Sequence, residues 1–346
     1  MKNKLCVFTL YSEKGASSQY RAFIFKDALE KKYNVYWYNF WNDSYVTKYM
    51  HNKKKYALNI ICQYFVSSLK RIYQLLFIAP KADVVFIQKA TIPKIKTTFL
   101  KNMKSKNVRI VFDVDDAVYT LPKDNSDKIA EAADCVICGN ETLKGHYQRY
   151  CKNCVVIPTV DNTNLYSLHW KDTFDKKIIG WIGSKTTIDN FDLIIDALNE
   201  ISQRHSEVKI AIISNTALDY TNKIKNSYLI PWSAETYLKA LSTFTIGIMP
   251  LKDNEFTRGK CGFKLIQYLN MKKPVIGSGV GVNSKIIEGN GIEANTTEEW
   301  VCAIETLLYD ETAYRRYVSH IEEVFFQQYH FDIVANQIMN ILAGEC

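Results

Sequence analysis

The stretch Pro250-Leu-Lys-Asp-Asn-Glu-Phe-Thr-Arg-Gly-Lys-Cys-Gly-Phe-Lys-Leu-Ile-Gln-Tyr268 follows an apolar run typical of a strand and leads into a helix. Arg258, Lys260 and Lys264 bring three cations to the start of that helix. Two glycines in the same stretch allow the backbone to approach a ligand closely, and the free N–H groups of a helix start favour a phosphate. The stretch therefore predicts a phosphate-binding segment. The plainer alternative is a helix start with ordinary basic solvation.

Strand-like and helix-like segments alternate on both sides of this stretch, which predicts the α/β class, with parallel sheets covered by helices on both faces. A loop is expected over Gly15–Tyr20, with helices over Arg21–Lys31, Ile92–Lys104, Asp189–Arg204 and Gly262–Asn270. The expected strands are Lys4–Leu10, Asn34–Asn39, Asp83–Gln88, Arg109–Asp113, Cys135–Cys138, Val155–Pro158, Lys177–Trp181, Lys209–Ser214, Thr245–Met249 and Pro274–Gly277.

This pattern repeats once along the 346 residues, which predicts two Rossmann-like domains. We expect an N-terminal acceptor-binding domain over residues 1–165 and a nucleotide-sugar-binding domain over residues 166–322. A helical tail over residues 323–346 is expected to pack back on the N-terminal domain.

Composition narrows the class of protein further. With 47% apolar, 13% aromatic and 23% charged residues, the chain is neither disordered, collagen-like nor a coiled coil. It has no G-x-G-x-x-G or P-loop motif, so a dinucleotide dehydrogenase or a P-loop NTPase has little support.

Nine cysteines include the pairs Cys135/Cys138 and Cys151/Cys154, but no nearby His or further Cys completes a zinc set, which favours reduced thiols. No apolar run is long enough to span a membrane and none is convincing as a signal peptide, so a cytoplasmic protein is expected.

The net charge of +8 is unevenly distributed. Residues 1–165 contain 26 Lys and Arg against 14 Asp and Glu, whereas residues 166–346 contain 18 against 22. Residues 51–110 alone hold 13 basic residues and one acid, Asp83. Apolar residues recur there at helical spacing, so the segment is either a basic amphipathic helix for an anionic membrane surface or a core-facing helix with a solvated side. These apolar residues are Ile60, Ile61, Tyr64, Phe65, Leu69, Ile72, Tyr73 and Leu76.

The run from Arg258 to Tyr268, continued by Pro274-Val-Ile-Gly-Ser-Gly-Val-Gly-Val-Asn283, resembles the donor-binding segment of glycosyltransferase family 4. The resemblance covers nearly the whole chain. It includes Phe112-Asp-Val-Asp-Asp-Ala117, Gly180-Trp-Ile-Gly-Ser184, Ile230-Pro-Trp232 and Ile246–Leu251. It implies the GT-B fold, in which two Rossmann-like domains face each other across a cleft, and retaining transfer of a sugar without a required metal.

The resemblance also implies roles for single residues. Arg258 and Lys260 would stabilise the charge of the leaving diphosphate. Asp115 and Asp116, which with Asp113 end a buried-type strand, would position the acceptor hydroxyl or accept its proton. Two carboxylates could instead hold Mg²⁺, which we consider the weaker reading. The residues expected around the donor are Gly15, Arg21, Gly183, Ser184, Lys185, Asn215, Trp232, Gly262, Phe263, Lys264 and Gln267. Trp232 would contact the nucleobase or be a core aromatic residue.

The chain departs from the family pattern at three positions. Many members have two glutamates eight residues apart, whereas Gly259 and Gln267 stand here. Gln267 could still bind ribose hydroxyls through uncharged hydrogen bonds, but no residue replaces the first glutamate. Thr245 stands where one branch of the family often has Asp.

The predicted function is that of a retaining hexosyltransferase. It would use a UDP- or GDP-sugar as substrate, with no tightly bound cofactor, and a lipid-linked or cell-surface polysaccharide precursor as acceptor. The basic segment predicts peripheral attachment to the inner face of the plasma membrane. The alternatives are a sugar-nucleotide epimerase of the same fold and a pseudo-transferase that binds donor without turnover. A nucleic-acid-binding protein has the least support, because no binding module is recognisable.

Overall fold

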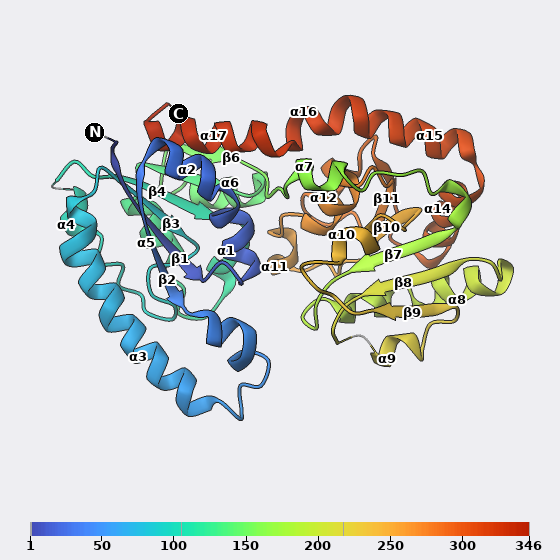
Figure 1. Cartoon of the computed structure of the whole chain (residues 1–346), viewed down its shortest axis with the longest axis horizontal. Helices are drawn as coiled ribbons and strands as arrows, with labels where there is room; N and C mark the ends of the chain where they lie inside the picture. Colours follow the sequence, from blue (N-terminus) through green and yellow to red (C-terminus); the bar gives the residue numbers. More distant parts are fainter. Residues whose placement is uncertain (1, 105, 217, 346) are drawn as a thin grey trace. The chain divides into compact units, whose positions relative to one another are not determined.

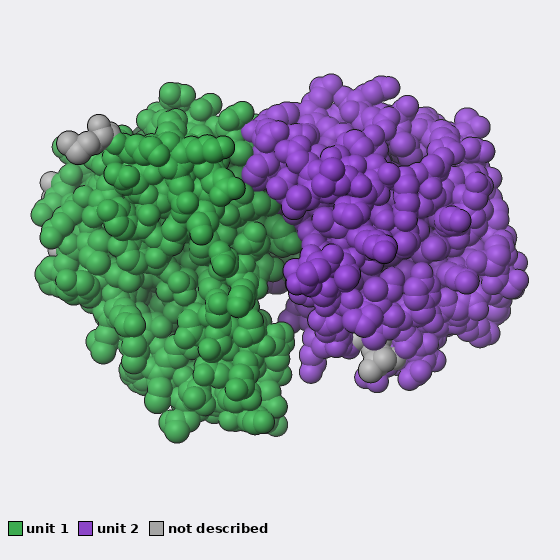
Figure 2. Space-filling view, in the orientation of Figure 1, with its two compact units in different colours: residues 1–159, 259–261, 334–346 green, residues 160–258, 262–333 purple. Residues whose placement is uncertain are grey.

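The computed structural model describes residues 2–104, 106–216 and 218–345. The chain forms two compact units, shown in different colours in Figure 2. Unit 1 comprises Met1–Thr159, Gly259–Cys261 and Val334–Cys346, and unit 2 comprises Val160–Arg258 and Gly262–Ile333.

Unit 1 is built on a six-stranded parallel sheet whose strand order is β2-β1-β3-β4-β5-β6 (Figure 1). The four inner strands are mainly apolar and almost wholly buried, as in other all-parallel sheets, whereas the edge strand β2 is largely exposed or half-buried. The strands are β1 (Lys4–Tyr11), β2 (Asn34–Trp41), β3 (Val84–Gln88), β4 (Arg109–Val114), β5 (Cys135–Cys138) and β6 (Cys154–Val156). The helices are α1 (Ala16–Arg21), α2 (Lys26–Lys32), α3 (Ala57–Tyr73), α4 (Lys101–Lys104), α5 (Ser126–Ala132), α6 (Glu141–Tyr147) and the part of α17 (Phe331–Ala343) from Val334 onward.

Unit 2 has a second six-stranded parallel sheet, with the order β12-β11-β10-β7-β8-β9. A large apolar core lies between this sheet and helices α8 and α14. The strands are β7 (Ile178–Ile182), β8 (Lys209–Ile213), β9 (Ser227–Ile230), β10 (Ile246–Met249), β11 (Val275–Gly277) and β12 (Gly291–Glu293). The helices are α7 (Thr163–Ser167), α8 (Ile195–Arg204), α9 (Leu218–Thr221), α10 (Tyr237–Leu241), α11 (Glu255–Arg258), α12 (Phe263–Asn270), α13 (Asn283–Ile287), α14 (Thr297–Tyr309), α15 (Glu311–His320) and α16 (Phe326–Tyr329).

The expected fold class is confirmed, because the two sheets are parallel and each is connected through helices. In unit 1 the strand order reverses between β1 and β3, and in unit 2 it reverses between β7 and β10. Open parallel sheets bind ligands beyond the carboxyl ends of their strands at such a reversal. The topology therefore points to the loops that follow β1 and β3 in unit 1, and β7 and β10 in unit 2.

Three sequence predictions in unit 1 are wrong. The helix expected over Arg21–Lys31 is divided, because Arg21 ends α1, a 3-10 turn spans Phe23–Phe25 and α2 begins at Lys26. The loop expected over Gly15–Tyr20 is largely helix α1, which begins at Ala16. The helix expected over Ile92–Lys104 shrinks to the four residues of α4. Pro93 and the left-handed backbone of Lys94 and Phe99 (φ 64° and 60°) interrupt it. The buried Asn125 amide stabilises the irregular chain instead by donating to the carbonyls of Ile92 and Ile95.

In unit 2, the helix predicted over Asp189–Arg204 is split in the structure. A 3-10 turn spans Ile188–Leu193, and α8 follows from Ile195. The α-helix therefore begins six residues after the predicted start, at Ile195.

Helix α3 is fixed to the sheet by a buried arginine. The Arg71 guanidinium, 1% exposed, donates to the carbonyl oxygens of Thr91 (2.8 Å), Tyr38 (2.8 Å) and Thr9 (3.1 Å). It also lies 5.0 Å from the centre of the Phe8 ring. These contacts determine which side of α3 faces the sheet. Among the described residues, no helix is long and apolar enough to cross a membrane.

We expect Arg71→Leu to lower the free energy of unfolding by about 3 kcal/mol, because three buried carbonyl groups lose their donor. Urea unfolding of the whole chain measures this change. Lys70→Ala, an exposed neighbour on the same helix, is the control and should change stability by less than about 0.5 kcal/mol. Equal effects of the two substitutions would contradict the anchoring role of Arg71.

Candidate functional site

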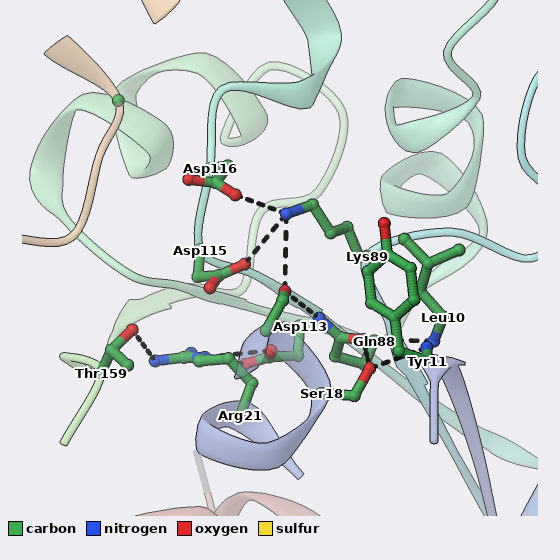
Figure 3. A network of polar contacts seen from close by, with 12 residues as sticks. Leu10, Tyr11, Ser18, Arg21, Gln88, Lys89, Asp113, Asp115, Asp116 and Thr159 are labelled. Atoms are coloured by element: carbon green, nitrogen blue, oxygen red, sulfur yellow. Dashed lines mark hydrogen bonds and ion pairs between the residues drawn. The ribbon is translucent and has the colours of Figure 1, made fainter. Parts of the chain in front are cut away.

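Charged side chains gather at the carboxyl ends of β3 and β4, beside the strand-order reversal of unit 1 (Figure 3). Asp113, the fifth residue of β4, is fully buried and accepts hydrogen bonds from the Arg21 guanidinium at 2.5–3.2 Å. Arg21 ends helix α1 and also donates to Ile157 O (3.0 Å) and Thr159 Oγ1 (3.3 Å). Burial alone would lower the pKa of Arg21, but the Asp113 carboxylate raises it above its ordinary value. Burial raises the pKa of Asp113, although the charge and hydrogen bonds of Arg21 oppose this. The hydrogen bonds of the pair tie β4 to α1.

Lys89, the residue directly after β3, forms the second half of the cluster. Its ammonium donates to Asp116 and lies 3.8 Å from Asp115 Oδ1. Its backbone is left-handed (φ 72°), which is costly for a lysine and is maintained where the surrounding structure requires it. Burial disfavours the ammonium, yet the two carboxylates raise the pKa of Lys89 above its ordinary value. Lys89 is thus a permanent cation between two acids.

Asp115 and Asp116 differ in their electrostatic environment. Burial raises the pKa of Asp115 to about 6, and the charge of Asp116 adds to this although Lys89 opposes it. Burial opposes ionisation of Asp116 too, but Lys89 and Lys260 lower its pKa below the ordinary value. Asp115 Oδ1 is buried without a hydrogen-bond donor among the described residues. One carboxyl group of the pair is therefore suited to exchange a proton near neutral pH, and the other remains ionised.

The loop after β1 is held against the same edge by uncharged groups. Gln88, the last residue of β3, accepts from Ser18 Oγ (2.9 Å) and from Leu10 N (3.3 Å), and its amide donates to Ser17 Oγ (3.0 Å). Gly15 is the residue before α1, and a Cβ there would lie 2.4 Å from Tyr11 Cβ. Of the two residues expected near the donor, Arg21 thus pairs with Asp113, and Gly15 packs against Tyr11.

The segment Gly259–Cys261 belongs to unit 1 and packs on this cluster. The Asn140 side chain donates to the carbonyls of Gly259 and Lys260, both at 3.0 Å, and its Oδ1 caps α6. A Cβ at Gly259 would lie 2.5 Å from the Cβ of Ala117. This glycine therefore allows a close approach to Ala117. The contact with Ala117 also explains why Gly259 stands where many members of the family have glutamate, because no side chain fits at this position.

In unit 2, Gly183, Ser184 and Lys185 form the turn directly after β7, at the strand-order reversal. The Ser184 carbonyl accepts the N–H groups of Thr187 (3.0 Å) and Ile188 (3.1 Å), so the turn starts a 3-10 helix. A Cβ at Gly183 would lie 2.3 Å from the Trp181 ring, which explains the glycine by packing. Lys185 is exposed at the tip of the turn.

Asn215 and Trp232 lie together at the ends of β8 and β9. The Asn215 amide donates to Trp232 O (3.2 Å) and its Oδ1 accepts from Trp232 N (2.9 Å). The Trp232 side chain is 43% exposed, so the core alternative for this residue is wrong. A rigidly held, solvent-exposed indole at the carboxyl edge of the sheet is able to stack on a flat ring.

Helix α12 places the remaining donor residues of unit 2. It begins after Gly262, whose backbone is left-handed (φ 64°), and Phe263 is its first residue. The Lys264 ammonium lies 5.6 Å from the centre of the Trp181 ring.

Arg258, at the end of α11, is exposed and makes a bidentate ion pair with Asp253 at 2.6 and 2.9 Å. The Nη1 group of Arg258 is not part of this ion pair.

Gln267 is only 5% exposed, and its amide is engaged inside the protein. The Gln267 Nε2 atom donates to Asp161 Oδ2 at 3.2 Å, and Tyr166 donates its hydroxyl to the same oxygen at 2.7 Å. Burial raises the pKa of Asp161 despite these hydrogen bonds. The donor group of Gln267 therefore serves a buried carboxyl group, and its carbonyl oxygen is the part left for a sugar hydroxyl.

Thr245 and the cysteines have plainer surroundings. Thr245 is buried and exchanges hydrogen bonds with Thr173 O and Ile178 N, so it joins the chain before β7 to β10. The eight cysteines that the structure describes are free thiols. Within the described ranges, no group of three or more His, Cys, Asp and Glu side chains is arranged to hold a metal ion.

Residues 176–310 match the family model described as glycosyl transferases group 1. This range contains the unit 2 sheet and most of the expected donor-binding residues. No curated protein matches the chain.

Several solved structures share the fold. HepE from Anabaena, solved with UDP, has a TM-score of 0.66 at 14% identity over 99% of this chain and 100% of its own. A glycosyltransferase from Rickettsia africae has a TM-score of 0.72 at 13% identity, covering 99% of this chain and 98% of its own. TarM from S. aureus has a TM-score of 0.58 at 16% identity, covering 79% of this chain and 58% of its own.

The fold is therefore that of the GT-B glycosyltransferases, two α/β units with parallel six-stranded sheets. Within it, residues 176–310 match the family model of the group 1 glycosyl transferases.

Sequence reasoning identified the aspartates but missed Lys89 and Asn140. Lys89 is a single lysine after a buried strand, and its position at the same sheet edge as Asp113 was the available signal. Asn140 follows β5 in the same way, one residue after Gly139. Both could have been found by asking which polar residue follows each parallel strand.

We expect Lys89→Met to destabilise the chain more at pH 8 than at pH 5. Without the cation, the pKa values of Asp115 and Asp116 in the folded state rise above their unfolded values. The free energy of unfolding therefore falls as the pH rises, because the buried carboxyl groups are forced to ionise. The loss should be about 3 kcal/mol at pH 8 and about half of that at pH 5. Urea unfolding at both pH values measures it, with the exposed Lys96→Met as control. A loss that does not depend on pH would contradict the pairing.

Proposed function

We propose that the chain is a retaining glycosyltransferase that moves a hexose from a nucleotide-sugar donor to a hydroxyl group of a glycan precursor. The observation that carries this proposal is the match of residues 176–310 to the group 1 glycosyl transferase model, with Ser184 and Lys185 exposed at the strand-order reversal of the unit 2 sheet and Trp232 exposed after its edge strand β9. The UDP in the HepE structure supports a uridine nucleotide as the donor's leaving group.

Unit 2 would bind the donor. In the proposal, Trp232 contacts the nucleobase, and the turn of Gly183–Lys185 and the start of α12 face the diphosphate. Arg258 and Lys264 supply positive charge in unit 2, and the resemblance assigns the same role to Lys260, which belongs to unit 1. When the bond to the sugar breaks, negative charge grows on the leaving diphosphate while the sugar becomes oxocarbenium-like. Cations and N–H groups already in place stabilise that change without reorganisation, which is the largest contribution to the rate.

Unit 1 would bind the acceptor near Asp115 and Asp116. An acceptor hydroxyl must lose its proton as it attacks. Asp115, with a pKa of about 6, is ionised in most molecules at neutral pH, and its Oδ1 has no hydrogen-bond donor among the described residues. Asp116, held by Lys89, would orient the hydroxyl. The diphosphate leaving group is an alternative acceptor for the proton, in which case both aspartates only position the hydroxyl.

The proposed class of acceptor rests on the positive charge of residues 51–110. Residues 51–110 hold 13 basic residues and one acid, which suits attachment to an anionic membrane surface. A lipid-linked intermediate or a cell-surface polysaccharide precursor is therefore the proposed acceptor. The protein would act at the cytoplasmic side, where nucleotide sugars are made.

A donor-binding protein without turnover is the second candidate. It is favoured by Gly259, which leaves no side chain where the family often has glutamate, and by Gln267, whose amide serves Asp161. Incubation with donor alone and with donor plus acceptor separates the candidates. Transfer requires a glycosylated product with the donor's anomeric configuration, an epimerase converts the donor alone, and a pseudo-transferase leaves the donor intact.

We expect UDP to raise the melting temperature of the chain and Trp232→Ala to weaken UDP binding about tenfold, because base stacking on an aromatic ring is lost. Calorimetric titration with UDP and GDP measures both the affinity and the choice of base. Tyr228→Ala, which removes another exposed aromatic residue from the neighbouring strand β9, is the matched control and should bind UDP as the native chain does. Unchanged UDP affinity in Trp232→Ala would remove this residue from the donor site.

A further inference from the structure

Helix α3 carries large apolar side chains on the side that faces away from the sheet of unit 1. Leu58, Phe65 and Leu69 are 73%, 64% and 69% exposed, and three more residues continue the row. We refer to these six as the outer stripe: Leu58, Ile61, Phe65, Leu69, Tyr73 and Phe77. Soluble surfaces rarely expose so many large apolar side chains together, and such patches mark interaction sites.

The outer stripe runs along α3 and continues to Phe77 in the π-helical turn Gln74–Ile78 that follows it. Its members follow one another at steps of three or four residues, which places them above each other on one side. The opposite side is occupied by Ile60, Tyr64 and Ile72, which pack on the cluster around Phe40 and Trp41. Tyr64 also donates its hydroxyl to Pro93 O at 2.7 Å. With Arg71 anchored as well, α3 cannot roll to bury the stripe without losing these contacts.

Positive charge surrounds the stripe. Between Asp43 and Asp83 the sequence contains no acidic residue. Lys53, Lys54 and Lys55 lie exposed just before α3, and Lys70 and Lys81 lie exposed within and after it. A face that is apolar along its middle and cationic at both ends is complementary to an anionic lipid surface, whose headgroups attract the lysines while its acyl chains accept the stripe.

We propose that α3 lies in the plane of an anionic bilayer, with the outer stripe among the acyl chains and the lysines at the level of the headgroups. The stripe from residue 58 to residue 77 is about 29 Å long at the rise of an α-helix. Since the helix is bound to the sheet along its other side, it docks flat and does not span. This inference adds residues to the membrane attachment in the proposed function.

A second copy of the chain is the other occupant that an apolar helix face could take, and charge disfavours it. In an antiparallel pair of α3 helices, Lys53–Lys55 of one copy would approach Lys81 of the other. No acidic residue between positions 43 and 83 is present to compensate the like charges. An anionic bilayer removes the same repulsion.

The test is flotation of the full chain with vesicles of phosphatidylglycerol and phosphatidylcholine in equal parts, compared with vesicles of phosphatidylcholine alone. We expect binding to the anionic vesicles only, and weaker binding at high salt. Replacing Lys53, Lys54 and Lys55 by Gln should weaken the partition on the order of a hundredfold, at about fivefold for each cation. The double substitution Phe65→Ser and Leu69→Ser should weaken it at least tenfold.

Leu168→Ser is the matched control, because this leucine is 77% exposed but lies outside α3. It should bind vesicles as the native chain does. Vesicle binding that is equal in the native chain and in the Phe65/Leu69 variant, or no binding at all, would overturn the proposal. A native dimer that the Phe65/Leu69 variant converts to a monomer, without vesicle binding, would assign the stripe to a second copy.

Two further readouts keep the result unambiguous. The lysine variant changes only exposed residues before the helix, so it tests the proposal even if the Phe65/Leu69 variant folds poorly. UDP titration of every variant separates the two proposals, because loss of vesicle binding with UDP binding kept concerns α3 alone. Failure of the native chain to bind any nucleotide would instead count against the proposed glycosyl transfer.

Discussion

Two cations and three carboxyl groups buried at one edge of the unit 1 sheet are the constraint on which the candidate site depends. Removing charges from water is expensive, and it is tolerated only when each charge has a well-placed partner. Arg21 satisfies Asp113, and Lys89 satisfies Asp116 and approaches Asp115. Because the partners come from α1, β3 and β4, the ion pairs fix the relative positions of these elements. Removing either cation leaves a buried carboxylate without compensation.

The arrangement also separates the two adjacent acids in function. Asp113 is fully committed to Arg21 and can only be structural. Asp116 is kept ionised by Lys89, while burial leaves Asp115 with a raised pKa and an oxygen without a donor. Neighbouring residues of the same type thus receive different protonation behaviour from their surroundings. Unit 2 contrasts with this, since Trp232, Lys185 and Arg258 are exposed and are positioned by hydrogen bonds and turns.

The sequence predicted most of the fold, because buried parallel strands are nearly continuous apolar runs. Cys135–Cys138 was predicted with its observed bounds, and the short strands β9 and β12, which are only half-buried, were not placed. The failed helix at Ile92–Lys104 depends on Asn125, more than twenty residues away, which no local pattern reveals. The same limit applies to the site. Asp115 and Asp116 form a visible cluster, whereas the role of Lys89 comes from strand register, and the reason for Gly259 is its contact with Ala117.

The central claim is that cations of the segment 258–264 stabilise the leaving diphosphate, and Lys260→Ala tests it most directly. The assay is transfer from the UDP-sugar that binds in calorimetry to a glycan acceptor, with Lys285→Ala, an exposed lysine on α13, as control. The account predicts a loss of turnover on the order of a hundredfold in Lys260→Ala. The melting temperature should stay close to that of the native chain, whereas UDP should bind more weakly, because it carries the same diphosphate charge. Turnover within twofold of the native chain would contradict the account.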